Sequence, residues 1–164
     1  MDYSSCSVAL VTFLEVRDKL TETHDAIRRI REVRGQLDGL RERLDTADAE
    51  EGQNASRDLL DADLLDAIRE LDRKMTVVEE ALYQTKNKSR QDPLNYPIKL
   101  NNKIAALQGV VEGGDGKPTQ QSYTVFKELS SRLDAELAKL ETALKADLPP
   151  FNKEIAAKKL ETVK

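Results

Sequence analysis

The sequence predicts an all-α protein, an antiparallel up-down four-helix bundle with a short C-terminal tail helix. Apolar residues recur at alternating steps of three and four over long stretches, which is the period of an amphipathic helix. Segments rich in glycine, proline and small polar residues separate these stretches. The 164 residues are 39% hydrophobic and 34% charged, which suits one core with a solvated exterior. We expect residues 1–12 to be an N-terminal extension, native or added, and residues 13–164 to form a single helical bundle domain.

The first helix is expected to run from about Phe13 to about Asp45. Its apolar seam contains two arginines, which argues against a strict coiled coil because only their stems can cover apolar surface. Val33 and Leu40 lie beside this seam, so we expect them to form apolar surface that the core does not use. The seam positions are Phe13, Val16, Leu20, Thr23, Ile27, Ile30, Arg34, Leu37, Arg41 and Leu44.

The second helix follows a polar loop, residues 46–57, in which the periodicity is lost. The helical rhythm returns at Leu60 and is expected to continue to about Lys88. Two long helices joined by a modest loop form an antiparallel αα-hairpin. The apolar positions of this helix are Leu60, Leu64, Ile68, Leu71, Met75, Val78 and Leu82.

Residues 91–100, QDPLNYPIKL, contain two prolines that cannot lie inside a regular helix. We expect Pro93 to end the second helix and Pro97 to occupy the first turn of the third. Leu94 and Tyr96 are apolar enough to plug the end of a bundle. The segment is therefore interpreted as a corner between two hairpins. In the alternative, Asn95 and Tyr96 form an exposed loop that recognises a partner.

Two more helices complete the predicted bundle. The third is short and carries Leu100, Ile104, Leu107 and Val111, and the turn GGDGKPT at 113–119 follows it with Thr119 as N-cap. The fourth carries an apolar row from Tyr123 to Leu148. Pro149 and Pro150 are expected to end it, and a short tail helix from Phe151 to about Leu160 to cap the bundle.

Composition argues against several classes of partner. A net charge of −4 and a pI of about 5.2 give no electrostatic reason to expect nucleic acid. The apolar run from Val8 to Leu14 is too short for membrane insertion. Cys6 is the only cysteine, so neither an intrachain disulfide nor a cysteine-based metal site can form.

The motifs of the common enzyme classes are incomplete. The string Gly116-Lys117-Pro118-Thr119 lacks the spacing and the preceding strand of a phosphate-binding loop. His24 is the only histidine, so a di-iron bundle site has too few ligands, and no Gly-x-Ser-x-Gly elbow occurs. We therefore expect no catalytic residue, no metal ligand and no cofactor, and we expect that the chain is not an enzyme.

An arginine cluster on the first helix leaves two interpretations open. Arg28, Arg31 and Arg34 could hold a small anionic ligand or an acidic peptide. Alternatively they form a solvated face that is paired with the interleaved acids Asp25 and Glu32.

Two strings carry a resemblance to a known family. FLEVRDKLTETHDAIRRIREVRGQL (13–37) and DPLNYPIKLNNKIAALQGVVEGGDGKPTQQSYTVFKELSSRLDAELAKL (92–140) resemble the C-terminal helical segment of bacterial sortilin-like, Asp-box (BNR) repeat β-propeller proteins known as glycosyl hydrolases. The resemblance implies a helical accessory domain of a larger exported protein, periplasmic or extracellular. It also implies that any hydrolase activity belongs to propeller domains, because no Asp-box motif occurs in these residues.

The sequence is therefore interpreted as a non-catalytic structural or interaction module. The expected partners are proteins, either other domains of the parent chain or a second copy in a homodimer. Binding is expected to bury apolar residues that the bundle core leaves over. The candidates are Val33, Leu40 and the apolar residues of the tail helix.

Overall fold

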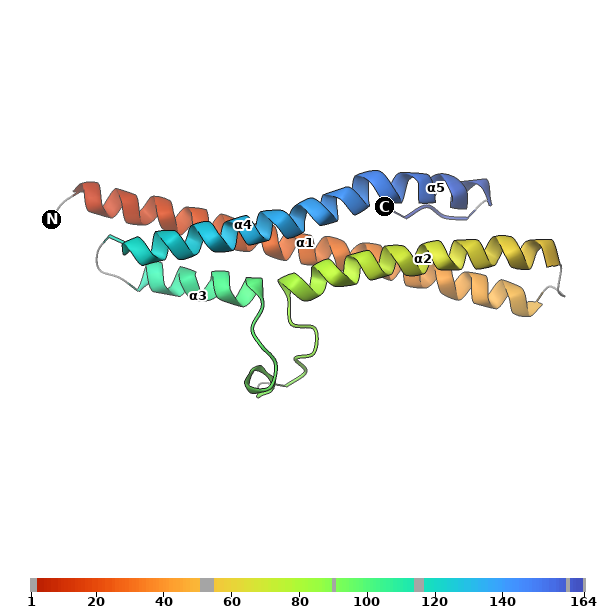
Figure 1. Ribbon diagram of the computed structural model, residues 1–164, viewed down its shortest axis with the longest axis horizontal. Coiled ribbons are helices and arrows are strands. Elements are labelled where there is room, and N and C mark those ends of the chain that lie inside the picture. The colour runs from red at the N-terminus through yellow and green to blue at the C-terminus, as the bar shows by residue number, and fades with distance from the viewer. Residues whose placement is uncertain (1–2, 51–54, 90, 114–116, 159, 164) are drawn as a thin grey trace. The chain divides into compact units, whose positions relative to one another are not determined.

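The computed structural model describes residues 3–50, 55–89, 91–113, 117–158 and 160–163, with side chains at 12–44 and at most positions from 62 onward. Within these ranges every regular element is a helix (Figure 1). This confirms the predicted all-α helical bundle. The α-helices are α1 (Tyr3–Glu50), α2 (Ala55–Leu82), α3 (Leu100–Glu112), α4 (Gln120–Thr142) and α5 (Leu148–Ala157).

The helices form two compact units. Unit 1 comprises Met1–Ile27 and Glu79–Ala138, and unit 2 comprises Arg28–Val78 and Lys139–Lys164. The helices α1, α2 and α4 contribute residues to both units.

Unit 1 contains the first part of α1, the last turn of α2, α3 and most of α4. In Figure 1, α3 runs antiparallel to the parts of α1 and α4 that belong to this unit. Thr119 is the N-cap of α4, as predicted, because its Oγ1 accepts the Ser122 amide at 3.2 Å. The buried Thr23 hydroxyl donates to the Lys19 carbonyl at 2.8 Å, so it occupies the apolar seam at no cost in hydrogen bonds. The core contains Val16, Ile27, Leu100, Ile104, Leu107, Val111, Leu129 and Leu133.

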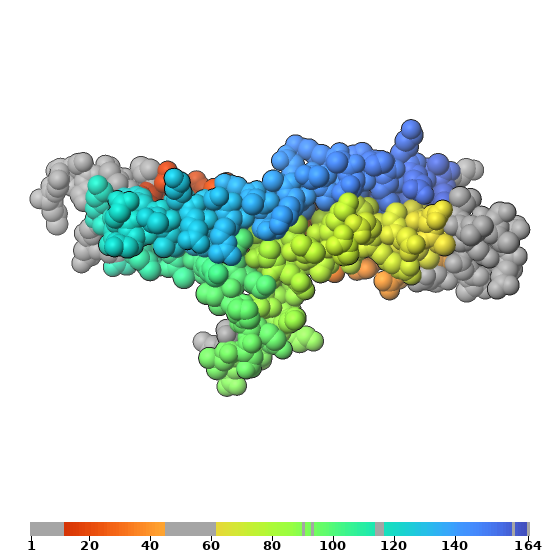
Figure 2. Space-filling view, in the orientation of Figure 1, coloured from red at the N-terminus to blue at the C-terminus, as the bar shows by residue number. Residues whose placement is uncertain are grey.

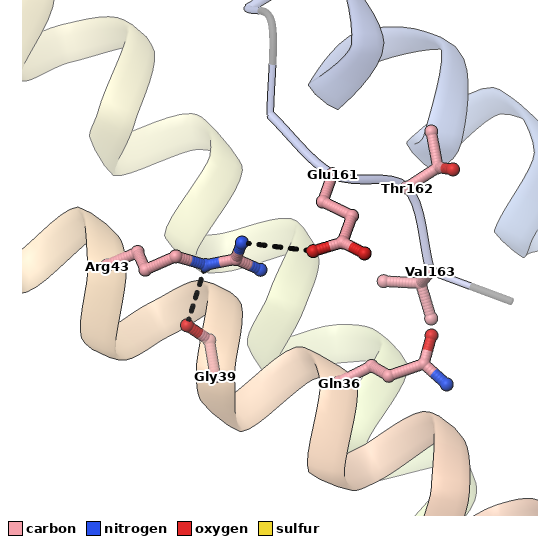
Figure 3. A pocket seen from close by; sticks show the side chains of 6 residues that line it. All are labelled: Gln36, Gly39, Arg43, Glu161, Thr162 and Val163. Carbon is pink, nitrogen blue, oxygen red and sulfur yellow. Dashed lines mark hydrogen bonds and ion pairs between the residues drawn. The ribbon is translucent and has the colours of Figure 1, made fainter.

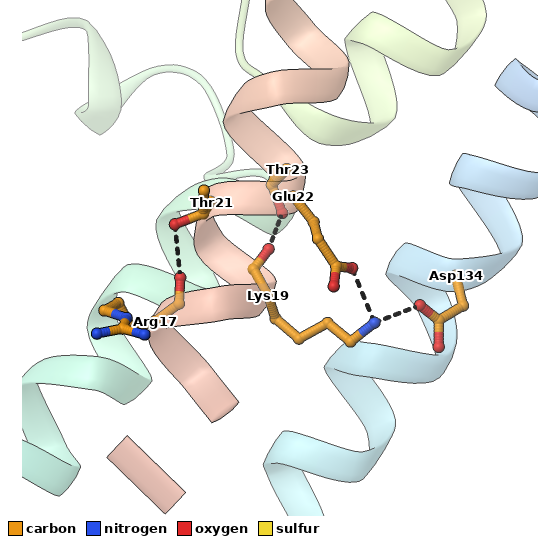
Figure 4. A network of polar contacts seen from close by, with 6 residues as sticks. All are labelled: Arg17, Lys19, Thr21, Glu22, Thr23 and Asp134. Carbon is orange, nitrogen blue, oxygen red and sulfur yellow. Dashed lines mark hydrogen bonds and ion pairs between the residues drawn. The ribbon is translucent and has the colours of Figure 1, made fainter. Parts of the chain in front are cut away.

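A lysine at the centre of Figure 4 joins two helices of unit 1. Lys19 Nζ lies 2.8 Å from Asp134 Oδ1 on α4 and 2.9 Å from Glu22 Oε2 on α1. Partial burial lowers the pKa of Lys19, but hydrogen bonds to the two carboxylates outweigh that effect and leave the pKa raised. Asp134 remains more than half exposed, so the bridge adds little to stability.

Unit 2 contains the remainder of α1, most of α2, and the end of α4 with α5. Ile30, Leu37, Met75 and Phe151 are buried in it together with Val33, Leu40, Leu44, Leu64, Ile68, Leu71, Val78, Leu140, Ala143, Leu148, Ile155 and Val163. The C-terminal residues return along α1, where Arg43 lies 3.5 Å from Glu161 (Figure 3). The Asn152 side chain fixes this return, since it donates to the Val163 carbonyl at 2.6 Å and accepts the Val163 amide at 2.8 Å.

The prediction that Val33 and Leu40 are surplus apolar surface is wrong. Both side chains are 0% exposed, whereas Arg41 is exposed. The same alternation of three and four residues is also kept by a row that is apolar throughout, at positions 30, 33, 37, 40 and 44. The buried seam therefore contains Val33 and Leu40, each one residue before an arginine of the predicted seam. Phe151 and Ile155 of the tail helix are buried too, so none of these four residues is free for a partner.

Both ends of α2 differ from the prediction. The predicted loop at 46–57 shrinks, because α1 continues to Glu50 and α2 begins at Ala55, while residues 51–54 lie outside the described ranges. At its other end α2 stops at Leu82, six residues before the predicted end at Lys88.

The C-terminal helical stretch is long, which corrects the predicted short tail helix after a proline break. A π-helical turn, η2 (Ala143–Asp147), connects α4 directly to α5, and the Leu148 amide donates to the Ala143 carbonyl. Pro149 and Pro150 lie in the first turn of α5, directly after this π turn. Because proline is not tolerated inside a regular α-helix, the helix passes through these two residues only where its backbone changes to π-helical geometry.

Candidate functional site

The segment Tyr83–Lys99, here called the 83–99 loop, joins α2 to α3 within unit 1. It projects away from the two helix ends that it connects (Figures 1 and 2). Among the loop residues that the structure describes, the only regular element is a 3₁₀ turn, η1 (Asp92–Leu94), with Pro93 at its start. Pro97 does not lie in the first turn of the next helix as predicted, since Lys99 has extended backbone and α3 begins only at Leu100.

One carboxylate organises the tip of the loop. Asp92 Oδ2 accepts the amides of Lys88 at 2.5 Å and Ser89 at 2.6 Å, and Asp92 Oδ1 accepts the Ser89 hydroxyl at 2.7 Å. The Ser89 hydroxyl, followed by the two amides, lowers the pKa of Asp92. These bonds give the Lys88 and Ser89 amides partners outside a helix, so α2 does not extend to Lys88 as predicted.

A buried glutamine holds the base of the loop. Gln84 Nε2 donates to the Pro97 carbonyl at 2.9 Å, and Gln84 Oε1 accepts the Lys86 amide at 3.4 Å. Gln84 is 6% exposed, so its amide is shielded from competing water. The clamp therefore joins the two ends of the loop and preorganises the residues between them.

The apolar side chains of the loop face solvent. Leu94 is 88% exposed, Ile98 48% and Tyr96 37%, and Asn95 is exposed as well. The prediction that Leu94 and Tyr96 plug the end of the bundle is therefore wrong, because the segment extends outward instead of folding back. Six large hydrophobic side chains are exposed in the described part of the chain, and the loop holds three of them.

The same region is basic in an acidic protein. Between residues 83 and 103 the sequence has five bases, Lys86, Lys88, Arg90, Lys99 and Lys103, against the single acid Asp92. The side chains of Lys86 and Lys88 are exposed. Arg90 lies outside the described ranges. A surface with exposed apolar groups and excess positive charge favours an acidic partner.

A hollow of about 270 Å³ lies at the base of the loop, between the ends of α2 and α3 and the side of α4. Its apolar lining consists of Ala81, Ile98, Leu100 and Ala135. Three bases and one acid form the rest: Lys99, Lys103, Arg132 and Glu136.

The predicted arginine cluster lies in unit 2. Arg28 and Arg31 are exposed, whereas Arg34 is partly buried and its Nε lies 2.7 Å from Asp72 Oδ1 on α2. Arg34 therefore connects two helices of the unit. The Nε of Arg34 is therefore already engaged within the unit.

No group of three or more His, Cys, Asp and Glu side chains in the described ranges could hold a metal ion. His24 is exposed on α1. Among the helices that the structure describes, none has both the length and the apolar character needed to cross a bilayer.

Comparison of the chain with protein families, curated proteins and solved structures gives no match.

The sequence predicts Asn95 and Tyr96 as an alternative recognition loop but assigns Leu94 to the bundle and gives Gln84 and the lysines no role. The sequence signal for this region is the set of five bases with one acid around the two prolines.

Proposed function

We propose that the chain is a non-catalytic helical interaction module whose bundle holds the 83–99 loop out toward a protein partner. One observation carries the proposal: Leu94 is 88% exposed at the tip of a loop whose base is clamped by a buried glutamine. Burying a leucine on binding is favourable by about 1.5–3 kcal/mol. A preorganised loop loses less conformational entropy when it binds, so more of that gain remains as affinity.

The partner is either another domain of the parent chain or a second copy. The resemblance to the C-terminal helical segment of exported Asp-box repeat β-propeller proteins supports the first. In that setting the module is an accessory domain, and hydrolysis belongs to the propellers. Asp-box repeats in the reading frame upstream of Met1 would support this context, and a frame without them would remove it.

The experiment measures both associations. Sedimentation equilibrium over a range of concentrations reports self-association, and calorimetric titration with the domain encoded upstream reports binding between domains. We expect at least one association, weakened about tenfold or more by Leu94→Ser. The matched control is Val125→Ser on α4, which removes another exposed apolar side chain of unit 1 and should leave association unchanged. A chain that is strictly monomeric and does not bind its upstream domain would overturn the proposal.

A further inference from the structure

We infer that the hollow at the base of the 83–99 loop is a binding site for an acidic peptide segment that carries one aliphatic side chain. The inference rests on the proposed function, because it names the chemistry of the partner. The aliphatic group enters the hollow, and the neighbouring carboxylates meet the bases around it.

The lining of the hollow supports the aliphatic part of this ligand. Ala81, Ile98, Leu100 and Ala135 come from the end of α2, the loop, and the helices α3 and α4. Ile98 is 48% exposed, so it offers apolar surface that the unit 1 core does not cover. A volume of about 270 Å³ admits one medium-sized side chain of a ligand segment.

The charges around the hollow support the acidic part. Lys99 and Lys103 lie one helical turn apart at the start of α3, and Arg132 approaches from α4. Two acids accompany these bases: Glu136 in the lining, and Glu128, whose Oε1 lies 3.7 Å from Arg132 Nη1. Lys86 and Lys88 are two further exposed bases of the same loop. An acidic segment thus meets positive charge on the loop, on α3 and on α4.

The shape of the site favours a peptide over a membrane. An anionic bilayer could take up Leu94 and attract the lysines, but a flat surface cannot fill a hollow beneath a projecting loop. A peptide side chain can enter it, as anchors do in protein interfaces.

The test is fluorescence anisotropy with a labelled peptide, Glu-Asp-Glu-Leu-Glu-Asp-Glu, and the full chain. We expect saturable binding that weakens as salt rises from low to physiological concentration. A peptide with serine in place of leucine should bind at least about tenfold more weakly, because it lacks the aliphatic side chain that the hollow buries. A peptide with the acids replaced by their amides should lose binding.

Two variants of the chain locate the site. Lys99→Glu with Lys103→Glu should weaken binding at least tenfold, and Lys117→Glu with Lys127→Glu is the matched control with the same change in net charge. Ala135→Phe, at an exposed position of α4, fills the hollow without altering any charge and should also weaken binding. Circular dichroism checks that each variant keeps its helix content.

If the control pair weakens peptide binding as much as Lys99→Glu with Lys103→Glu does, the peptide is attracted by net charge and not by a defined site. That result would overturn the inference. If the Ala135→Phe variant binds the peptide as well as the wild-type chain does, the peptide does not enter the hollow, and the inference is overturned. Binding to phosphatidylserine vesicles without binding to the peptide would also overturn it, in favour of a membrane surface. The two proposals can also fail separately. If the chain binds the peptide at the hollow but neither self-associates nor binds its upstream domain, this inference stands and the proposed partners are wrong.

Discussion

Truncation of Leu40 distinguishes the core that the structure shows from the surplus apolar surface expected from the sequence. Leu40 is 0% exposed, and Leu40→Ala removes three buried carbon atoms. At about 0.8 kcal/mol per carbon the transfer cost is roughly 2.4 kcal/mol. The cavity that remains raises the total to roughly 3–4 kcal/mol, within the range of about 2–5 kcal/mol typical of such changes. A chain of this size should then lose about 6–16 °C in Tm.

The measurement is urea unfolding followed by circular dichroism, with Arg41→Ala as the control at the next position. Arg41 is exposed, so its truncation should change the free energy of unfolding by less than about 0.5 kcal/mol. A Leu40→Ala variant that loses less than about 1 kcal/mol, or an Arg41→Ala variant that loses as much as Leu40→Ala, would refute the assignment of the buried seam.

Three further predictions concern the loop and the C-terminal return. Because the pKa of Asp92 is lowered in the folded loop, its contribution is complete above its ordinary pKa and is lost as pH falls through the lowered value. Hydrogen exchange of the Lys88 and Ser89 amides should therefore stay slower than in an unstructured chain down to about pH 4 and lose this protection at lower pH. Protection that is unchanged well below pH 4 would contradict this. Gln84→Ala removes the bond to Pro97 and should speed tryptic cleavage in the loop, with a stability cost of about 0.5–1.5 kcal/mol for the lost hydrogen bond. Unchanged cleavage would show that the clamp is not needed. Asn152→Ala removes both bonds to Val163 and should speed carboxypeptidase digestion of the last residues, whereas a rate equal to that of the wild-type chain would show that apolar burial alone holds them.

The sequence predicts helices well here because their signals are local. The period of apolar residues identified all four main helices, and the preference of threonine for N-caps located the start of α4 at Thr119. The choice between neighbouring seams was harder. Positions 33 and 40 are apolar and 34 and 41 are arginines, so both rows have helical spacing. Which row is buried depends on how the other helical segments of unit 2 pack around α1, and no local pattern specifies that packing.

The loop and the prolines depended on contacts that are distant in sequence. The loop that replaces the predicted end of α2 is held by Asp92, which binds amides three and four residues before it, and by Gln84, which reaches Pro97 thirteen residues later. At the other end of the chain, the π turn lets a helix pass through Pro149 and Pro150, where proline rules predict a break. The candidate site at the loop base joins residues of α2, α3 and α4, so the sequence shows its charge but not its hollow.

Amide chemical-shift mapping of the ¹⁵N-labelled chain with the acidic leucine peptide tests the central claim most directly. The account predicts that the perturbed amides belong to the 83–99 loop, the first turn of α3 and the α4 residues near Arg132 and Ala135. It also predicts no change at Arg28, Arg31 and Arg34. Shifts confined to those arginines, or spread evenly over the charged surface, would contradict the claim that the loop and its base are the binding element.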